Sequence, residues 1–344
     1  MSLHDETDYV EALTVSYDAE GHPSGVPTYL RDYAELYARD PREAGLSWFF
    51  GAHIGVSLGF GLHSLIGRGE EALAEGELTA EQYGMLPTRF DCKNFNAIDI
   101  VELTVAAGGR YLAFQPVAPD GFSLYNSACN DYNSVKSAAG RDLMGELAST
   151  CEYHGVGLVL EFPLGRNFRR WPQGIDAAGG SVSEYAQYIR EQLHELLTAY
   201  GPVAAVSFSG MEHAGKHLQE IDLKDLCAMV AMLQPNTLVA FEDGGQGFED
   251  FYCVDSRGKA AQLPPGKPAQ LVLPMTPGHR SFDASLAGRH LKAEALWQEL
   301  REARKAQCNL VLNTALMPDG SLDLEDITTL LEIGQRLEKG GLPH

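Results

Sequence analysis

The chain has 344 residues, a length that suits one large α/β barrel or two ordinary domains. Its 26 basic and 47 acidic residues give a net charge of −21, which repels nucleic acid phosphates and anionic membrane surfaces. No stretch approaches the roughly 20 apolar residues that a membrane-spanning helix needs, and the N-terminus has no signal-peptide pattern. We therefore expect a cytoplasmic protein without nucleic acid or membrane partners; export stays open if a signal peptide has been removed.

The six cysteines are spread singly along the chain, with no CxxC pair and no spacing typical of metal ligands. A free cysteine usually behaves as a small buried hydrophobic residue. The sequence accordingly predicts reduced thiols, and we expect neither a metal nor a cofactor.

Seven short apolar runs, each bounded by turn residues, predict strands. Their hydrophobicity is nearly continuous, as it is in strands buried on both faces of a parallel sheet. They cover residues 53–60, 110–117, 155–162, 204–210, 237–244, 269–275 and 308–316.

Helical patterns lie between these runs. The clearest is at 181–201, where Ser181 and Glu184 form a possible capping box and Gly201 a stop. Similar patterns cover about 94–108, 141–154, 222–234, 291–307 and 324–339. Strands alternating with helices predict a (β/α)8-like TIM barrel; only seven strands stand out, which leaves open whether one strand is degenerate or missing. We expect a single domain over residues 1–344, with 1–45 as an irregular N-terminal segment packed on the barrel.

Four segments carry a family resemblance. IGVSLGFGLHSLIGRGE matches the pattern FGxxxHWGxYSxxGxGEW, and AAGGRYLAFQPVAPDGFSLYNSA matches AGAKYxxxTxKHHDGFxLxxSxxT. GRDLMGELASTCEYHGVGLVLEF follows RDxVxExxxACRxxGLxFGxYYS, and CNLVLNTALMPDGSLDLEDITTLLEIGQRL follows NLLLNxGPxPDGxIxxEDxxxLxEIGxxL. The chain thus resembles glycoside hydrolase family 29, the α-L-fucosidases. The resemblance implies a barrel, often followed by a β-sandwich, which we do not expect here because the chain ends just after the last barrel helix.

The resemblance also implies which residues have been replaced. The family's nucleophile is the Asp of a WFDG motif, and Ser209 stands in its place. The sugar-contacting His of HWG falls on Gly59, and the KHH before DGF falls on Val117, Ala118 and Pro119. A Ser hydroxyl without an adjacent base is a poor nucleophile and does not stabilise an oxocarbenium ion as a carboxylate does. Scaffold residues are kept while residues that touch the sugar are lost, which predicts a loss of fucosidase activity.

Some candidate chemistry remains at the ends of the predicted strands. Glu161 ends one strand, and Glu242 and Asp243 end the next but one. Burial raises the pKa of a carboxyl group, as a general acid requires. The alternative is that these side chains are solvated or ion-paired residues at the rim of an acidic protein.

Other residues could bind a ligand. Glu212 and His213, in MEHAGKH, follow the lost nucleophile, although a plain loop is the simpler explanation. Arg166 and Trp171 belong to the loop RNFRRWP, which suits an acidic or stacked ligand or an internal salt-bridge cluster.

Two further residues lie near the expected mouth. His63 replaces the family's usual Tyr, and a packed histidine is the simpler interpretation. Asp120 begins an Asp-Gly-Phe segment that favours a turn with or without a ligand.

Three hypotheses follow. The first is an α-L-fucosidase-like barrel without fucosidase activity that recognises a carbohydrate or a partner at its mouth. The second is an active glycosidase with relocated carboxylates acting on a different sugar. The third is a subunit that regulates or assembles with an active enzyme, which would show as a large apolar patch. The sequence leaves the oligomeric state open.

Overall fold

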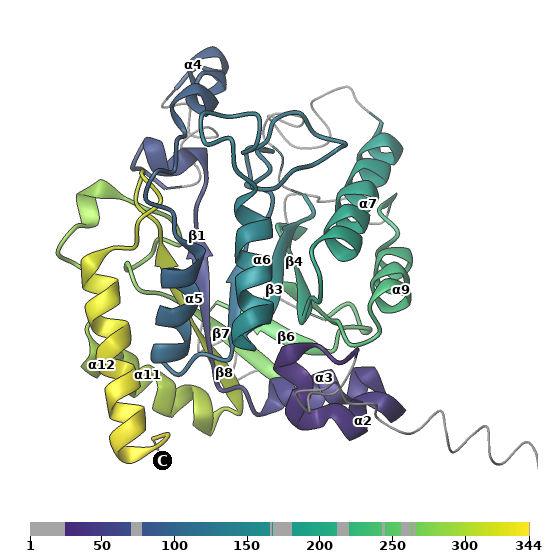
Figure 1. Cartoon of the computed structure of the whole chain (residues 1–344), viewed down its shortest axis with the longest axis vertical. Coiled ribbons are helices and arrows are strands. Elements are labelled where there is room, and N and C mark those ends of the chain that lie inside the picture. The colour runs from purple at the N-terminus through teal and green to yellow at the C-terminus, as the bar shows by residue number, and fades with distance from the viewer. Residues whose placement is uncertain are drawn as a thin grey trace, which may run out of the picture.

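Eight parallel strands close into a barrel in sequence order, from β1 next to β2 round to β8 next to β1 (Figure 1). The computed structural model describes residues 25–69, 78–165, 167, 181–211, 220–242, 245–255, 263 and 266–343. The strands are β1 (Ile54–Gly59), β2 (Tyr111–Phe114), β3 (Gly157–Pro163), β4 (Ala205–Ser209), β5 (Leu238–Glu242), β6 (Phe251–Val254), β7 (Ala269–Pro274) and β8 (Cys308–Ala315). The predicted TIM barrel is confirmed.

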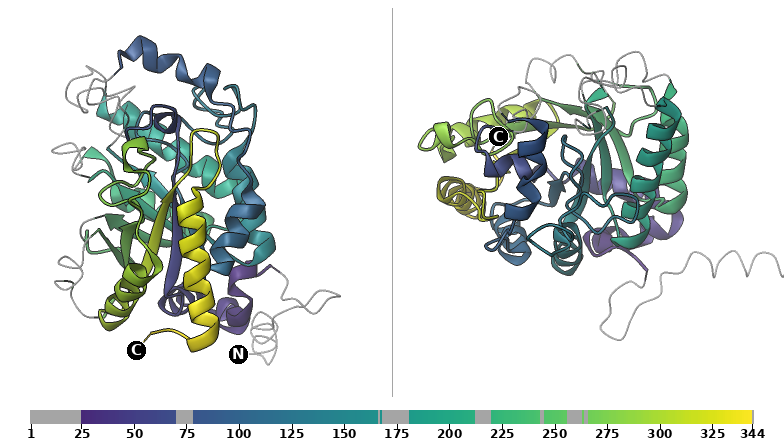
Figure 2. Two further views of the ribbon diagram at one scale, coloured as in Figure 1. Left: turned by 90° about the vertical axis from the view of Figure 1, so that its left-hand side faces the viewer. Right: turned by 90° about the horizontal axis from the view of Figure 1, so that it is seen from above.

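Helices cover much of the outside of the barrel, and among the described residues none lies between β5 and β7 in the chain (Figure 2, right). Those that follow strands are α5 (Ala97–Ala106), α6 (Leu143–His154), α7 (Val182–Ala199), α9 (Leu223–Leu233), α11 (Ala293–Lys305) and α12 (Leu324–Gly340), at the six predicted places. Shorter elements are η2 (Leu62–Leu65), α4 (Ala80–Gly84), η4 (Leu86–Arg89) and η6 (Ala284–Leu286). At the start of α7 the Ser181 hydroxyl accepts from the Glu184 N–H, and Gly201 follows the helix with a φ of 73°. The helix therefore begins and ends close to its predicted signals.

Two expectations need correction. No strand is missing, because the four residues of β6 pair with both β5 and β7. The described part of the segment predicted to be irregular is helical instead: it contains η1 (Thr28–Tyr33), α2 (Ala34–Arg39) and the start of α3 (Pro41–Phe50). Asp40 caps α3 by accepting from the Glu43 N–H, and Pro41 occupies the first turn, where its missing N–H is not needed.

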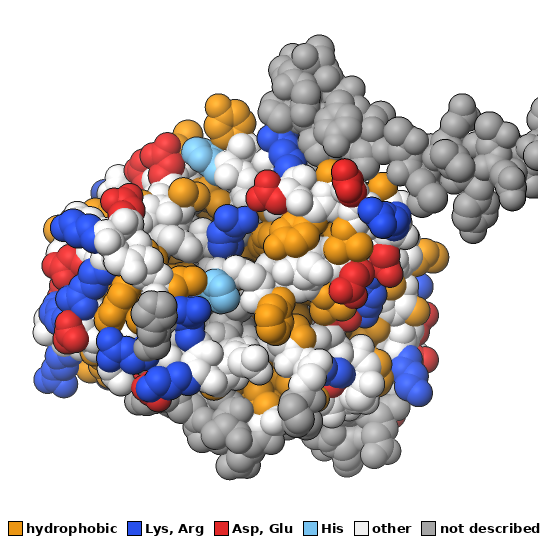
Figure 3. All heavy atoms as spheres, turned by 90° about the horizontal axis from the view of Figure 1, so that it is seen from below, with side chains coloured by type: hydrophobic (Ala, Val, Ile, Leu, Met, Phe, Trp, Pro, Cys, Tyr) orange, Lys and Arg blue, Asp and Glu red, His pale blue; other side chains and the backbone are white. Residues whose placement is uncertain are grey.

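The helix α3 closes the lower end of the barrel. Its Trp48 and Phe49 are buried among interior side chains, with ring centroids 6.2 Å apart for Trp48 and Tyr111 and 4.2 Å apart for Phe49 and Phe251. Gly157 leaves room for the Trp48 side chain, because a Cβ at this position would lie 2.4 Å from the Trp48 ring. From below, hydrophobic and charged side chains are mixed over the surface of this end (Figure 3). A site is therefore expected at the opposite end, where the strands finish.

The described helices contain no apolar stretch long enough to cross a membrane.

Candidate functional site

Three candidate residues from the sequence meet at the carboxyl ends of adjacent strands. Val159, Ala205 and Ala240 pack inside the barrel. Because side chains alternate along a strand, Glu161 on β3, Ser209 on β4 and Glu242 on β5 lie on the same interior face, nearer the mouth. The topology therefore brings the two predicted glutamates to one place.

Arg280 joins these two glutamates. Its Nη2 donates to Oε1 of Glu161 at 2.7 Å, and its Nη1 lies 3.5 Å from Oε1 of Glu242. The arginine comes from the segment that follows β7, so three separate strand ends contribute to this contact. The two carboxylates converge, as the relocated-carboxylate hypothesis requires, but a guanidinium lies between them.

The segment that carries Arg280 packs tightly over the end of β1. A Cβ placed on Gly59 would lie 1.8 Å from the Arg280 carbonyl oxygen and 3.1 Å from the Cα of Ser281. Position 59 therefore accepts no side chain while this segment stays in place. The glycine at position 59 is what allows the segment to lie here.

Hydrogen bonds fix the same segment at its far end. The Gly69 N–H donates to the Phe282 carbonyl at 3.1 Å, and the Ala284 N–H donates to the Gly67 carbonyl at 3.0 Å. A short antiparallel bridge between Thr276 and His279 forms a turn just before Arg280. The backbone that presents Arg280 is therefore tied to the segment after β1.

Ser209 takes part in the mouth through its backbone. Its carbonyl accepts from the Leu164 N–H at 2.9 Å, and the next residue, Gly210, donates its N–H to Oε2 of Glu242 at 3.1 Å. Gly210 has a φ of 68°, a conformation that favours glycine. The position thus orients Glu242, and Ser209 offers no carboxylate for nucleophilic attack.

Asp120 and His63 are buried in the segments that follow β2 and β1, so neither side chain is exposed at the mouth. The Tyr83 hydroxyl donates to Oδ2 of Asp120 at 2.6 Å, and the Phe122 N–H donates to Oδ1 at 2.8 Å. Burial raises the pKa of Asp120, and these hydrogen bonds partly offset that rise. His63, in η2, is also buried. The geometry of Asp120 is that of a turn anchor.

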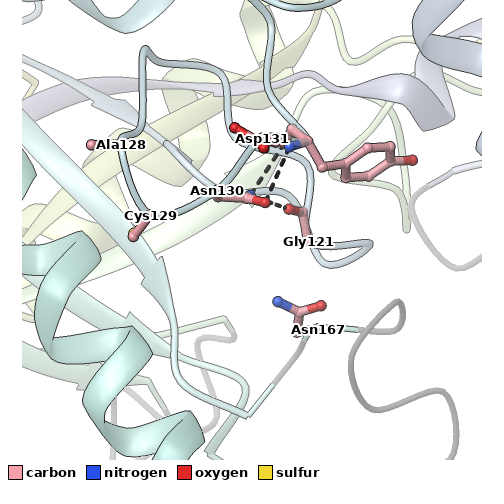
Figure 4. Close-up of a pocket in the computed structure, with 7 residues that line it drawn as sticks. Gly121, Ala128, Cys129, Asn130, Asp131 and Asn167 are labelled. Carbon is pink, nitrogen blue, oxygen red and sulfur yellow. Dashed lines mark hydrogen bonds between the residues drawn. The ribbon is translucent and has the colours of Figure 1, made fainter.

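A separate pocket of about 440 Å³ lies beside this turn (Figure 4). Asn130 and Asn167 approach Gly121 from different sides: Asn130 Nδ2 donates to the Gly121 carbonyl at 2.9 Å, and a Cβ on Gly121 would lie 2.4 Å from Asn167 Oδ1. Glu195 of α7 holds the loop that contains Ala128 and Cys129, because its Oε1 accepts from their N–H groups at 2.8 and 3.1 Å. Burial raises the pKa of the Cys129 thiol to about 11, so this thiol lines the pocket in its uncharged form.

One group of possible metal ligands lies elsewhere, at the start of α12. Ligand atoms of His290, Asp323 and Glu325 lie within 4.8 Å of one another. They already have partners: the His290 ring contacts Asp326 at 2.7 Å, and Glu325 pairs with Lys292. Their contacts hold the start of the helix in place.

The other predicted site residues lie outside the described part of the chain. They are Asp243, Glu212 and His213, with His217 nearby, and Arg166 and Trp171 of the arginine-rich loop.

Sequence reasoning missed Arg280. It stands in TPGHRSFD, a run of turn residues after a predicted strand, and its position there is the signal that could have found it. Residues that follow a barrel strand face the mouth whatever their type.

A family model places the chain among known proteins. The model described as Alpha-L-fucosidase matches residues 31–341. Among curated proteins, Alpha-L-fucosidase 1 of Arabidopsis thaliana is 30% identical over 164 residues, which are 46% of this chain and 30% of that protein. The Alpha-L-fucosidase of Dictyostelium discoideum is 29% identical over 121 residues, 33% of this chain and 26% of that one. The matched region thus spans less than a third of either relative.

Solved structures show the same fold. The α-L-fucosidase isoenzyme 1 of Paenibacillus thiaminolyticus has a TM-score of 0.77 at 22% identity, covering 88% of this chain and 77% of that one. The α-L-fucosidase AlfC of Lactobacillus casei, in complex with α-L-fucose, has a TM-score of 0.74 at 21% identity, covering 86% and 98%. Identities this low show the fold alone, whereas the family model covers nearly the whole chain. The chain belongs to the α-L-fucosidase family, glycoside hydrolase family 29.

Proposed function

We propose that this chain is an α-L-fucosidase family barrel that does not hydrolyse α-L-fucosides and that recognises a carbohydrate at its mouth. The observation that carries the proposal is the position of Arg280, whose guanidinium lies between Glu161 and Glu242. The backbone behind it fills the space next to Gly59.

The chemistry of retaining glycosidases explains why this arrangement argues against fucoside hydrolysis. Such enzymes place two carboxyl groups about 5 to 5.5 Å apart, and the anomeric carbon of the sugar enters between them. Here a side chain of the protein occupies the space between the two glutamates. The position of the family nucleophile, Ser209, adds no carboxylate.

The test is a panel of p-nitrophenyl glycosides that includes the α-L-fucoside, run with the wild type and with Ser209→Ala. We expect no fucoside turnover above the uncatalysed rate in either protein. Fucoside turnover by the wild type that disappears in Ser209→Ala would refute the loss of activity. Carbohydrate recognition is tested on a glycan array, with Glu161→Gln as the mouth variant. Absence of binding to every glycan contradicts recognition of a carbohydrate.

A second candidate, an active glycosidase for another sugar, is favoured by the convergence of Glu161 and Glu242. It requires the Arg280 side chain to leave the gap. In that case another glycoside of the panel is hydrolysed, and both Glu161→Gln and Glu242→Gln abolish the reaction while Ser209→Ala retains it.

A further inference from the structure

The space between Glu161 and Glu242 is built around a positive charge. We infer that the ligand of the mouth is an amino sugar, whose ammonium group takes the place of the Arg280 guanidinium between the two glutamates. The inference rests on the proposed carbohydrate recognition and specifies its chemical class.

The burial of the two glutamates supports a cation in this position. The side chain of Glu161 is 13% exposed and that of Glu242 is 25% exposed, so both carboxylates have lost much of their hydration. Half-buried carboxylates that converge are costly unless a cation lies between them. Arg280 supplies that cation when no ligand is bound.

The site keeps its shape when the arginine leaves. The Gly210 N–H holds Oε2 of Glu242, so this carboxylate stays oriented without Arg280. Burial raises the pKa of Cys253 in β6 to about 11, so this interior thiol is neutral at ordinary pH. The carboxylates therefore remain the groups that attract a positive charge.

The interior wall offers another acceptor. Asn313 of β8 is buried and donates from Nδ2 to the Ser57 hydroxyl at 3.0 Å, whereas its Oδ1 has no hydrogen-bond partner among the described residues. Its backbone carbonyl accepts from the Met275 N–H at 2.9 Å, at the base of the segment that carries Arg280. A ligand N–H or hydroxyl would satisfy this oxygen.

The arginine side chain is partly exposed, as its displacement by a ligand requires. It is 32% exposed, and its contact with Glu242 is long at 3.5 Å. The backbone at Arg280 is held against Gly59, so the side chain has to move rather than the segment. Because the Arg280 side chain occupies the position that the ligand needs, it lowers the apparent affinity of that ligand.

The charge of the mouth argues against an acidic sugar. The contacts of Arg280 with Glu161 and Glu242 join one arginine to two glutamates, and the chain as a whole carries a net charge of −21. A uronic acid would be repelled by this net charge, and a neutral sugar that displaced Arg280 would bring no cation in its place.

The experiment compares matched sugars by isothermal titration. The probes are glucosamine, galactosamine and mannosamine, each against its N-acetyl form, which keeps the ring and removes the charge. The proteins are the wild type, Arg280→Met, Glu161→Gln, Glu242→Gln and, as a control, Arg289→Met, which removes an exposed arginine further along the chain.

We expect at least one amine to bind the wild type more tightly than its N-acetyl form. Arg280→Met should tighten that binding by at least about tenfold because the internal competitor is gone. Either glutamine variant should weaken it by about tenfold or more, while Arg289→Met leaves it unchanged.

Two results would overturn the inference in distinguishable ways. If N-acetyl sugars bind as tightly as the amines and the glutamine variants make no difference, the cationic ligand is wrong while carbohydrate recognition stands. If no sugar binds any of the proteins in the titrations or on the glycan array, carbohydrate recognition fails and the amino sugar fails with it.

Discussion

Two buried carboxylates outside the strands, Asp326 of α12 and Asp120 of the turn after β2, are called the wall carboxylates. Their partners differ in kind from those of the two carboxylates at the mouth. In the wall, Asp326 accepts from the Thr314 hydroxyl at 2.6 Å and contacts the His290 ring, and Asp120 accepts from Tyr83 and Phe122. At the mouth, Glu161 and Glu242 share one arginine from a distant segment. The wall carboxylates join neighbouring segments and so hold the fold, whereas the mouth carboxylates share one side chain, and Glu242 is also held by the Gly210 N–H.

The largest effect should come from a wall carboxylate. Asp326→Ala should lower the free energy of unfolding by about 3 kcal/mol, because it removes a buried acceptor and leaves the Thr314 hydroxyl and the His290 ring without their partner. Chemical denaturation measures the change. Glu332→Ala, on the exposed side of the same helix, is the control and should stay within about 0.5 kcal/mol of the wild type. Similar losses in both variants would mean that the buried contacts of Asp326 do not stabilise the fold more than an exposed side chain of the same helix does.

Gly59→Ala tests the contact between the end of β1 and the segment that carries Arg280. We expect a loss of about 1–3 kcal/mol from overpacking, since the new methyl group collides with the Arg280 carbonyl. The displaced segment should also be cut faster by trypsin after Arg280. Gly84→Ala is the control, because a Cβ there meets nothing within 4 Å. Unchanged stability and unchanged cleavage in Gly59→Ala would mean that the segment does not rest on Gly59.

Asp120→Asn should change how stability depends on pH. Burial raises the folded-state pKa of Asp120, so its stabilising contribution is complete below the ordinary aspartate pKa of about 4 and is lost as the pH rises through the raised value. Asparagine does not titrate, so the stability of the wild type relative to the variant should fall as the pH rises. The fall amounts to about 1.4 kcal/mol for each pKa unit of the shift. A difference that is constant from pH 4 to 8 would contradict the raised pKa.

Arg280→Met should have the smallest effect on stability. We expect a loss of about 1 kcal/mol, because the Arg280 side chain is 32% exposed and water can reach the two glutamates once it is removed. Salt should reduce the difference by screening these charges. Arg336→Met, which breaks a pair with the largely exposed Glu294, serves as a comparison and should cost less. A loss as large as that of Asp326→Ala would place Arg280 with the fold-holding residues.

The strands and helices of the barrel could be largely predicted from the sequence, because their signals are local. Strands appear as apolar runs, and the helix at 181–201 has its capping residue and its glycine within the segment. The strand β6 was missed because its apolar run, FYCV, is only four residues long and stands between Asp250 and Asp255. Pairing with β5 and β7 completes this short strand.

The mouth could be predicted only in part. Glu161 and Glu242 were found because each ends an apolar run. Their shared partner was not found, since Arg280 lies 119 residues from Glu161 and nothing in TPGHRSFD indicates that its backbone packs on a glycine of β1. Contacts of this kind depend on how the loops pack in three dimensions.

The close approach of Arg280 to Gly59 makes substitutions at the mouth interdependent. An aspartate at Ser209 would add a carboxylate to the mouth but would leave the Arg280 guanidinium between Glu161 and Glu242. A histidine at Gly59 would collide with the Arg280 carbonyl unless the segment after β7 were rebuilt first. The effects of substitutions at positions 59 and 209 and in the segment after β7 are therefore expected to be non-additive. An engineer who wants to reshape this mouth has to change the three regions together.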